Sequence, residues 1–143
     1  MKLNHVLRSV LAAGLLFGAS AAFAQVVVIV SPKSSLASLT ADQASAIFMG
    51  KTNTLPNGAV AQAADLPESS NAHEIFYSKA AGKTSAQVKA TWARLTFSGK
   101  ATPPRELGSA AEVKKFVAAN PDAIGYIEKS AVDGSVKVVL TVE

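Results

Sequence analysis

The stretch Ser109–Ser130, SAAEVKKFVAANPDAIGYIEKS, predicts a helix followed directly by a strand. Ser109 and Glu112 have the spacing of a capping box, which marks a helix start. Apolar side chains then recur on one face of that helix, at Val113, Phe116 and Val117. Asn120 and Pro121 end the helix, because the residue before a proline avoids helical backbone. The apolar run AIGYIE that follows predicts a strand.

The segments nearer the N-terminus give the same alternation of strand and helix. Gln25–Val30, QVVVIV, is a short run of β-branched residues and predicts a buried strand. Thr40 and Gln43 form a second capping box, at the start of a helix that ends at Gly50. The inner face of that helix is formed by Ala44, Ile47 and Phe48. Residues 59–66, AVAQAADL, alternate weakly and predict another strand.

Two more helices and a last strand complete the pattern. Residues 70–81 predict a helix, and residues 85–97 predict another, introduced by a capping box of Thr84 and Gln87. The inner face of the second helix is predicted from Val88, Thr91, Trp92 and Leu95. Residues 136–142, VKVVLTV, predict the last strand. Strands at both ends with helices between them predict one α/β domain, with a mixed sheet flanked by helices.

The N-terminus has the features of a signal peptide. Lys2 and Arg8 give the chain a positively charged start, and the apolar run Val10–Phe17 follows them. Ala22-Phe23-Ala24 then matches a signal-peptidase site. We therefore expect cleavage after Ala24, so that residues 1–24 are the signal peptide and residues 25–143 are the mature domain. An uncleaved membrane anchor is the alternative, although the apolar run is short for a membrane span.

Composition limits the function classes. Without Lys2 and Arg8 the net charge falls from +4 to +2, and the remaining lysines are scattered, unlike the basic stripe of a nucleic-acid-binding protein. The chain has no cysteine, which excludes disulfides, thiolate metal sites, a cysteine nucleophile and a lipidated N-terminal cysteine. We expect an exported protein in the periplasm of a Gram-negative bacterium, or secreted beyond it, with no stable membrane insertion after cleavage.

Several sequence motifs resemble catalytic or nucleotide sites but lack required residues. Two short motifs resemble the end of a phosphate-binding P-loop but lack its earlier glycine, namely Gly50-Lys51-Thr52 and Gly82-Lys83-Thr84. We interpret both as helix ends. His73-Glu74 would need a second histidine where Tyr77 stands, so it forms no zinc-protease motif. We expect His73 to face solvent. Four aromatic residues are predicted to belong to the core: Trp92, Phe76, Phe97 and Phe116. No catalytic role, metal or cofactor is expected.

The remaining candidate site is the helix start at Ser69, Ser70 and Asn71. Free backbone N–H groups and the helix dipole make such a start suitable for an anion. Serine and asparagine are also the usual N-cap residues, so local sequence alone favours a purely structural role.

The order of segments resembles the phosphate ABC transporter substrate-binding proteins, which have a type 2 periplasmic-binding-protein fold. The resemblance rests on LTADQASAIFMGK, TWARLTFSGKATPP and EVKKFVAANPDAIGYIEKS, and extends from about Val26 to Leu140. It implies an α/β fold equivalent to one lobe of a two-lobed binding protein. It also implies phosphate or a similar oxyanion as ligand, and an ABC permease or another periplasmic protein as partner.

The resemblance also implies which residues form the site. The family places an arginine four residues before a Ser-Gly-Thr helix start, and the matching positions here are Asp65 and Ser69-Ser70-Asn71. The loop after the first strand is a second expected contact region. Its candidate residues are Ser31, Lys33, Ser34 and Ser35.

Two functional hypotheses follow from these residues. The first is a periplasmic solute-binding protein for phosphate or a related oxyanion, serving an ABC transporter or a sensing system. The second is a protein-interaction module that has kept the fold without the ligand. Asp65 separates them, because a carboxylate about 4 Å from an anion opposes binding by roughly 4 kcal/mol at an effective dielectric of 20. On the first hypothesis, Asp65→Arg is expected to create or tighten phosphate binding.

Overall fold

The structure, a computed structural model, describes residues 24–143. The predicted signal peptide and the alternative of a membrane anchor fall on residues 1–23, outside the described residues, with only Ala24 included. From residue 24 to residue 143, no helix is both long enough and apolar enough to cross a membrane.

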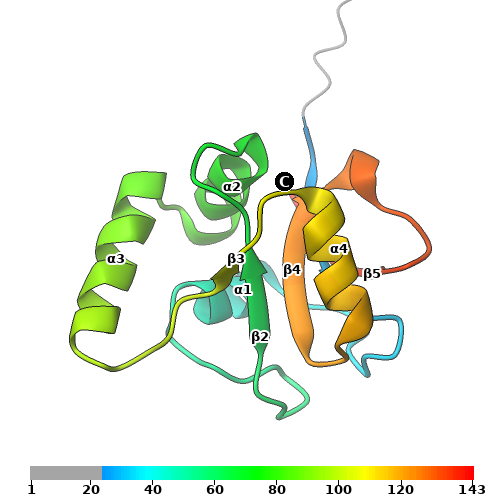
Figure 1. The fold of residues 1–143 in the computed structure, drawn as a ribbon, viewed down its shortest axis with the longest axis horizontal. Coiled ribbons are helices and arrows are strands. Elements are labelled where there is room, and N and C mark those ends of the chain that lie inside the picture. Colours follow the sequence, from blue (N-terminus) through cyan, green and yellow to red (C-terminus); the bar gives the residue numbers. More distant parts are fainter. Residues whose placement is uncertain (1–23) are drawn as a thin grey trace, which may run out of the picture.

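Five strands form one mixed sheet in the order β3-β2-β4-β1-β5 (Figure 1). The strands are β1 Val26–Val30, β2 Gln62–Asp65, β3 Arg105–Glu106, β4 Ala123–Glu128 and β5 Lys137–Val142. Strand β2 runs parallel to β3 and β4, whereas β1 runs antiparallel to β4 and β5. The mixed sheet and four of its strands were predicted from the sequence. The short strand β3 was not.

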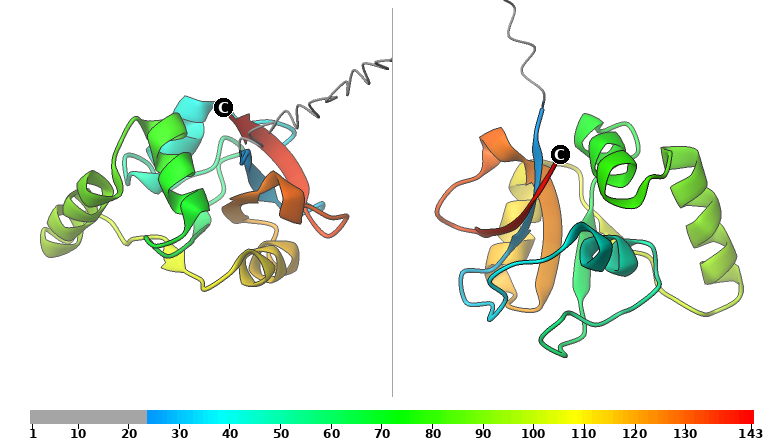
Figure 2. Two further views of the ribbon diagram at one scale, coloured as in Figure 1. Left: turned by 90° about the horizontal axis from the view of Figure 1, so that it is seen from above. Right: turned by 180° about the vertical axis from the view of Figure 1, so that it is seen from behind.

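Helices cover both faces of the sheet (Figure 2). They are α1 Ala41–Phe48, α2 Asn71–Phe76, α3 Ser85–Phe97 and α4 Ala110–Ala119, with a π-helical turn η1 Tyr77–Ala81 and a 3-10 turn η2 Lys129–Ala131. A Cβ built on Gly125 of β4 would lie only 2.7 Å from Val113 Cγ1 of α4. The next residue, Tyr126, points to the opposite face and stacks on Phe76 of α2 with ring centroids 4.2 Å apart. Gly125 therefore lets α4 approach one face, while α2 packs on the other.

Two of the three predicted capping boxes are confirmed. The hydroxyls of Thr40 and Thr84 each accept a hydrogen bond from the third helical residue, whose glutamine side chain accepts one in return. The start of α4 differs. The Ser109 hydroxyl accepts from the Glu112 N–H at 3.3 Å, but the Glu112 carboxylate accepts from the Gly108 N–H at 2.6 Å. The capping box at α4 is therefore only half formed.

The helix predicted over residues 70–81 is regular only to Phe76 and continues as the π-helical turn η1. Phe76 and Tyr77 are adjacent, and both are completely buried. Neighbouring residues of a regular α-helix point about 100° apart, so the wider π turn helps both rings to stay in the core. Gly82, with φ +64°, ends the helix as predicted.

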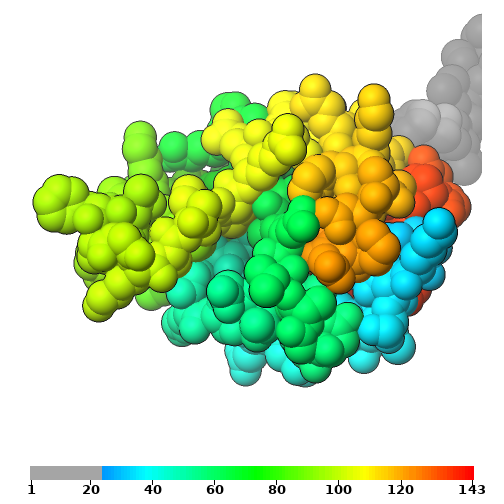
Figure 3. Space-filling model, turned by 60° about the horizontal axis from the view of Figure 1, so that its bottom comes forward, coloured from blue at the N-terminus to red at the C-terminus, as the bar shows by residue number. Residues whose placement is uncertain are grey.

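The prediction that an aromatic side chain belongs to the core is confirmed for Phe76 and wrong for Phe97. Phe97, at the end of α3, is 96% exposed, so its assignment to the core is wrong. In α3 only Val88 is buried, and Trp92 is half-buried, as is Phe116 of α4. The end of α3 projects to one side of the molecule (Figure 3), which explains why its last apolar side chain finds no core to enter.

Candidate functional site

The predicted ligand site lies at the carboxyl end of β2. After this strand the chain turns at Pro67, whose carbonyl accepts a hydrogen bond from the Ser70 N–H at 2.8 Å. Ser70 has the extended backbone of an N-cap residue, yet its hydroxyl makes no capping hydrogen bond. Ser69 and Asn71 are exposed, and Ser70 is half-buried. Their side chains are therefore available to a ligand at a helix start whose N–H groups favour anions.

The carboxylate of Asp65 is bound by donors within the protein. Its Oδ1 accepts hydrogen bonds from the Tyr126 hydroxyl and from the Leu66 N–H, the latter at 2.9 Å. Its Oδ2 accepts from the Tyr77 hydroxyl at 2.6 Å. Both oxygens of Asp65 are thus engaged inside the fold.

The two tyrosines that hold Asp65 belong to the core. Tyr77 and Tyr126 are completely buried and pack against Phe48 and Phe76. Burial, followed by the charge of Asp65, raises the pKa of both phenols far above the usual range, so both remain neutral donors. This role of the two tyrosines was not predicted from the sequence. The one available signal was a tyrosine in a buried strand, because a buried hydroxyl needs a partner.

The loop of residues 31–35 lies at the other end of the sheet from this helix start. Val30 pairs with Ile124 near the beginning of β4, and β4 runs parallel to β2. The loop therefore follows β1 at the end where β2 begins, whereas Ser69–Asn71 follows the end of β2 (Figure 1). The structure does not bring the two predicted contact regions together.

The serine hydroxyls of that loop accept hydrogen bonds from within the protein. Ser31 and Ser34 are buried, and each hydroxyl accepts a hydrogen bond from the backbone N–H two residues further on, at 3.1 and 3.2 Å. The Ser35 hydroxyl accepts one from the Asn57 amide at 3.0 Å. Lys33 is exposed. Local turn geometry accounts for Ser31 and Ser34, and the bond from Asn57 accounts for Ser35, without a ligand.

Acidic side chains flank the helix start on its outer side. Glu68 and Glu74 are exposed and line a hollow of about 540 Å³ between α2 and the start of α3. Lys83 lines the same hollow and is the one cation there. An anion at the helix start would therefore meet two exposed carboxylates, whose effect is reduced by solvent and salt.

His73 differs from its predicted position. It is buried, with 6% of its surface exposed, and its Nδ1 lies 3.1 Å from the Ser85 hydroxyl. Its ring also packs against Tyr77, with centroids 4.6 Å apart. The prediction of a solvent-facing His73 is wrong, because this side of α2 is covered by the start of α3.

No protein-family model and no curated protein matches the chain. Solved structures do resemble it. A Clostridium perfringens chain, assigned as a phosphate ABC transporter substrate-binding protein and solved with bound phosphate, has 22% identity and a TM-score of 0.63 over 81% of this chain and 45% of that one. An ABC-type phosphate transport receptor from Vibrio cholerae has 20% identity, a TM-score of 0.63 and coverages of 81% and 46%. PstS from Borrelia burgdorferi has 16% identity, a TM-score of 0.59 and coverages of 81% and 47%. The chain has a periplasmic-binding-protein fold.

The predicted fold is thereby confirmed, and the chain spans slightly less than half the length of these three structures. Identities of 16–22% establish the fold alone. In open α/β sheets, ligands bind outside the carboxyl ends of the parallel strands. In this periplasmic-binding-protein fold, the start of α2 at Ser69–Asn71 occupies such a position, whereas the loop of residues 31–35 does not.

Proposed function

We propose that the protein is a solute-binding domain that binds phosphate or a related oxyanion at the start of α2. The observation that supports this most is the free Ser70 hydroxyl, which makes no capping bond at a helix start beyond the end of β2. The side chains proposed to contact the ligand are those of Ser69, Ser70 and Asn71. The structural neighbours that are named for phosphate transport agree with this ligand class.

The expected affinity is low. A partly buried helix N-terminus stabilises an anion by up to about 2 kcal/mol, and each hydrogen bond to a charged group adds about 1.5–3 kcal/mol. Two such bonds bring the favourable total to about 5–8 kcal/mol, against an association cost of at least about 4 kcal/mol. The difference corresponds to a dissociation constant that is millimolar or weaker.

Asp65 is proposed to position the site rather than to contact the ligand. Its carboxylate joins the end of β2 to Tyr77 beyond α2 and to Tyr126 of β4. An arginine at this position would bring a guanidinium, which only donates hydrogen bonds, against two hydroxyl donors and one N–H donor. We therefore expect Asp65→Arg to destabilise the fold instead of tightening phosphate binding.

The biological setting is part of the same proposal. Export to the periplasm would follow from the predicted signal peptide, and an ABC permease or a sensing protein would receive the loaded domain. The protein-interaction module remains the competing function, and it requires no oxyanion at α2.

Weak binding at a defined helix start is best tested by NMR. We would titrate phosphate, and separately sulfate, into the ¹⁵N-labelled chain from Gln25 onward at constant ionic strength. Phosphate is expected to shift the amide signals of Ser70 and Asn71 with a saturable, millimolar dependence. The double variant with Ser69→Ala and Ser70→Ala is expected to lose this response. Ser130→Ala, at an exposed serine on η2, is the matched control.

The opposite result would remove the oxyanion proposal. If neither phosphate nor sulfate at tens of millimolar shifts the amides of α2 in the folded protein, the oxyanion proposal is wrong. Shifts that survive the double serine variant would place the anion elsewhere on the surface.

A further inference from the structure

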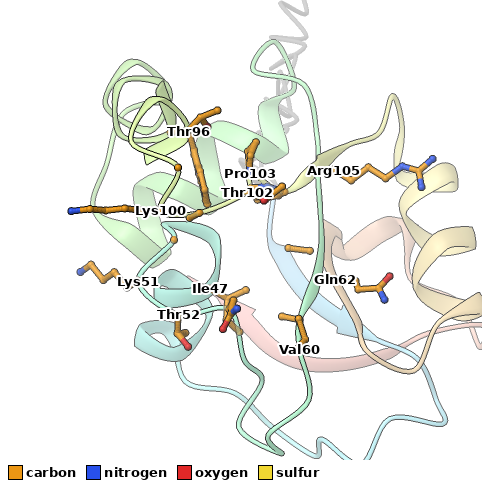
Figure 4. A pocket seen from close by; sticks show the side chains of 18 of the residues that line it. Ile47, Lys51, Thr52, Val60, Gln62, Thr96, Lys100, Thr102, Pro103 and Arg105 are labelled. Atoms are coloured by element: carbon orange, nitrogen blue, oxygen red, sulfur yellow. The ribbon is translucent and has the colours of Figure 1, made fainter. Parts of the chain in front are cut away.

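A second hollow lies away from the start of α2, between α1, β2 and the segment that joins α3 to β3 (Figure 4). Its volume is about 960 Å³. Three of its lining residues are cationic, namely Lys51, Lys100 and Arg105, and no carboxylate lines it. In Figure 4, Lys51 and Lys100 extend at one end of this groove and Arg105 lies at the other.

These three cations have no acidic partner in the part of the chain that the structure describes. The one ion pair formed within residues 24–143 joins Lys114 to Asp133, on another part of the surface. Lys51, Lys100 and Arg105 are all exposed. The Arg105 guanidinium lies 5.5 Å from the centre of the Phe116 ring, a cation–π contact that holds it beside α4.

The groove between the two charged ends combines apolar surface with hydroxyl groups. Val60 lines the groove and is 62% exposed, so its side chain is accessible to an apolar group of a ligand. Trp92 forms part of the wall and is held in place by a hydrogen bond from its indole N–H to the Phe48 carbonyl at 2.9 Å. Thr96 and Thr102 add hydroxyl groups to the lining.

We propose that this groove binds an extended acidic peptide segment of a partner protein. Carboxylates of such a segment would meet the lysines at one end and Arg105 at the other, and an apolar side chain between them would cover Val60. A single small oxyanion could not reach both charged ends. Nucleic acid fits less well, because three separated cations do not form the longer basic stripe that successive phosphate contacts require.

This inference is independent of the proposed oxyanion site. The groove and the helix start share no lining residue, since none of Ser69, Ser70 and Asn71 borders the groove. Loss of phosphate binding would therefore leave peptide binding unchanged, and the reverse also holds.

The test measures binding of a short fluorescein-labelled peptide of alternating glutamate and valine by fluorescence anisotropy. The comparison probes are the same peptide with glutamine for glutamate, and a labelled oligo-dT. We expect saturable binding of the glutamate peptide that weakens as salt increases. The double variant Lys51→Glu with Lys100→Glu is expected to weaken it about tenfold. The matched control, Lys79→Glu with Lys115→Glu, makes the same charge change at exposed lysines that do not line the groove, and should alter binding less than about twofold.

Three results would overturn the proposal. The first is equal binding of the glutamate and glutamine peptides, which would remove the role of charge. The second is an equal loss in the groove variant and the control, which would attribute binding to net charge alone. The third is tighter binding of oligo-dT than of the glutamate peptide, which would identify the groove as a nucleic-acid surface. Circular dichroism of both double variants ensures that the comparison is made between folded proteins.

Discussion

Raising the pH above about 10 is expected to unfold the protein through its two tyrosines. Tyr77 and Tyr126 are the only tyrosines of the chain, and both are completely buried with their hydroxyls on Asp65. In the unfolded chain each phenol loses its proton near pH 10. In the folded protein, burial and the Asp65 carboxylate raise both pKa values far above that range.

The sign and the size follow from linkage. Above pH 10 the unfolded state binds fewer protons than the folded state, so the free energy of unfolding falls as pH rises. Each tyrosine contributes about 1.4 kcal/mol per pH unit, and the two together remove about 5 kcal/mol by about pH 12. Because small domains are stable by about 5–15 kcal/mol, this loss suffices for alkaline unfolding.

Tyrosinate absorbance and folding can be followed in the same sample. The chain has a single tryptophan, half-buried Trp92, whose fluorescence reports unfolding together with circular dichroism. We expect tyrosinate to appear only as the protein unfolds, and Tyr77→Phe to halve the decline of stability with pH. Tyrosinate that forms with a midpoint near pH 10 in a protein that is still folded would refute the buried Asp65–tyrosine arrangement.

Three further predictions concern packing and surface charge. Gly125→Ala is expected to cost about 1–3 kcal/mol in urea unfolding, because its Cβ would come within 2.7 Å of a valine methyl of α4, whereas Gly134→Ala has nothing within 4 Å. Phe97→Ser is expected to change the free energy of unfolding by less than about 0.5 kcal/mol, because the side chain is 96% exposed. A hydrogen bond from the Ser135 hydroxyl is the largest cause that lowers the pKa of Asp133 to about 2. Ser135→Ala is expected to raise that pKa in an NMR titration. Because the pKa is lowered by folding, the stability from this carboxylate is present above its unfolded pKa and is lost as pH falls toward 2.

The parts of the fold that could be predicted depend on residues close together in the sequence. In the capping boxes at Thr40 and Thr84, a side chain bonds a backbone group three residues away. The residue types and their spacing are therefore enough to predict these hydrogen bonds. Gly82 ends its helix for an equally local reason, its left-handed backbone. The buried strand Val26–Val30 is evident from composition, because few other structures accommodate five consecutive β-branched residues.

The parts that could not be predicted depend on distant residues and on strand direction. Asp65 is bound by tyrosines 12 and 61 residues away, and no spacing rule connects them. The loop of residues 31–35 was placed in the ligand site because it follows the first strand. That strand runs antiparallel to its neighbours, so the loop emerges at the other end of the sheet. Local periodicity identifies a strand but carries no information about its direction.

The hydrogen bonds of the Asp65 carboxylate link the segment before the helix start of α2 to the protein core. Asp65 connects the end of β2 to the hydroxyls of two completely buried tyrosines, Tyr77 and Tyr126. These bonds are charge-assisted and partly buried, and removing Asp65 would leave two buried tyrosine hydroxyls without an acceptor. The start of α2 is therefore held in position by the core, with or without a ligand. A site ordered in this way loses little entropy on binding, but it has only two hydroxyls, one amide side chain and a helix terminus with which to attract an anion. For the proposed function, this combination favours a weak and rapidly reversible oxyanion site over one that captures phosphate tightly.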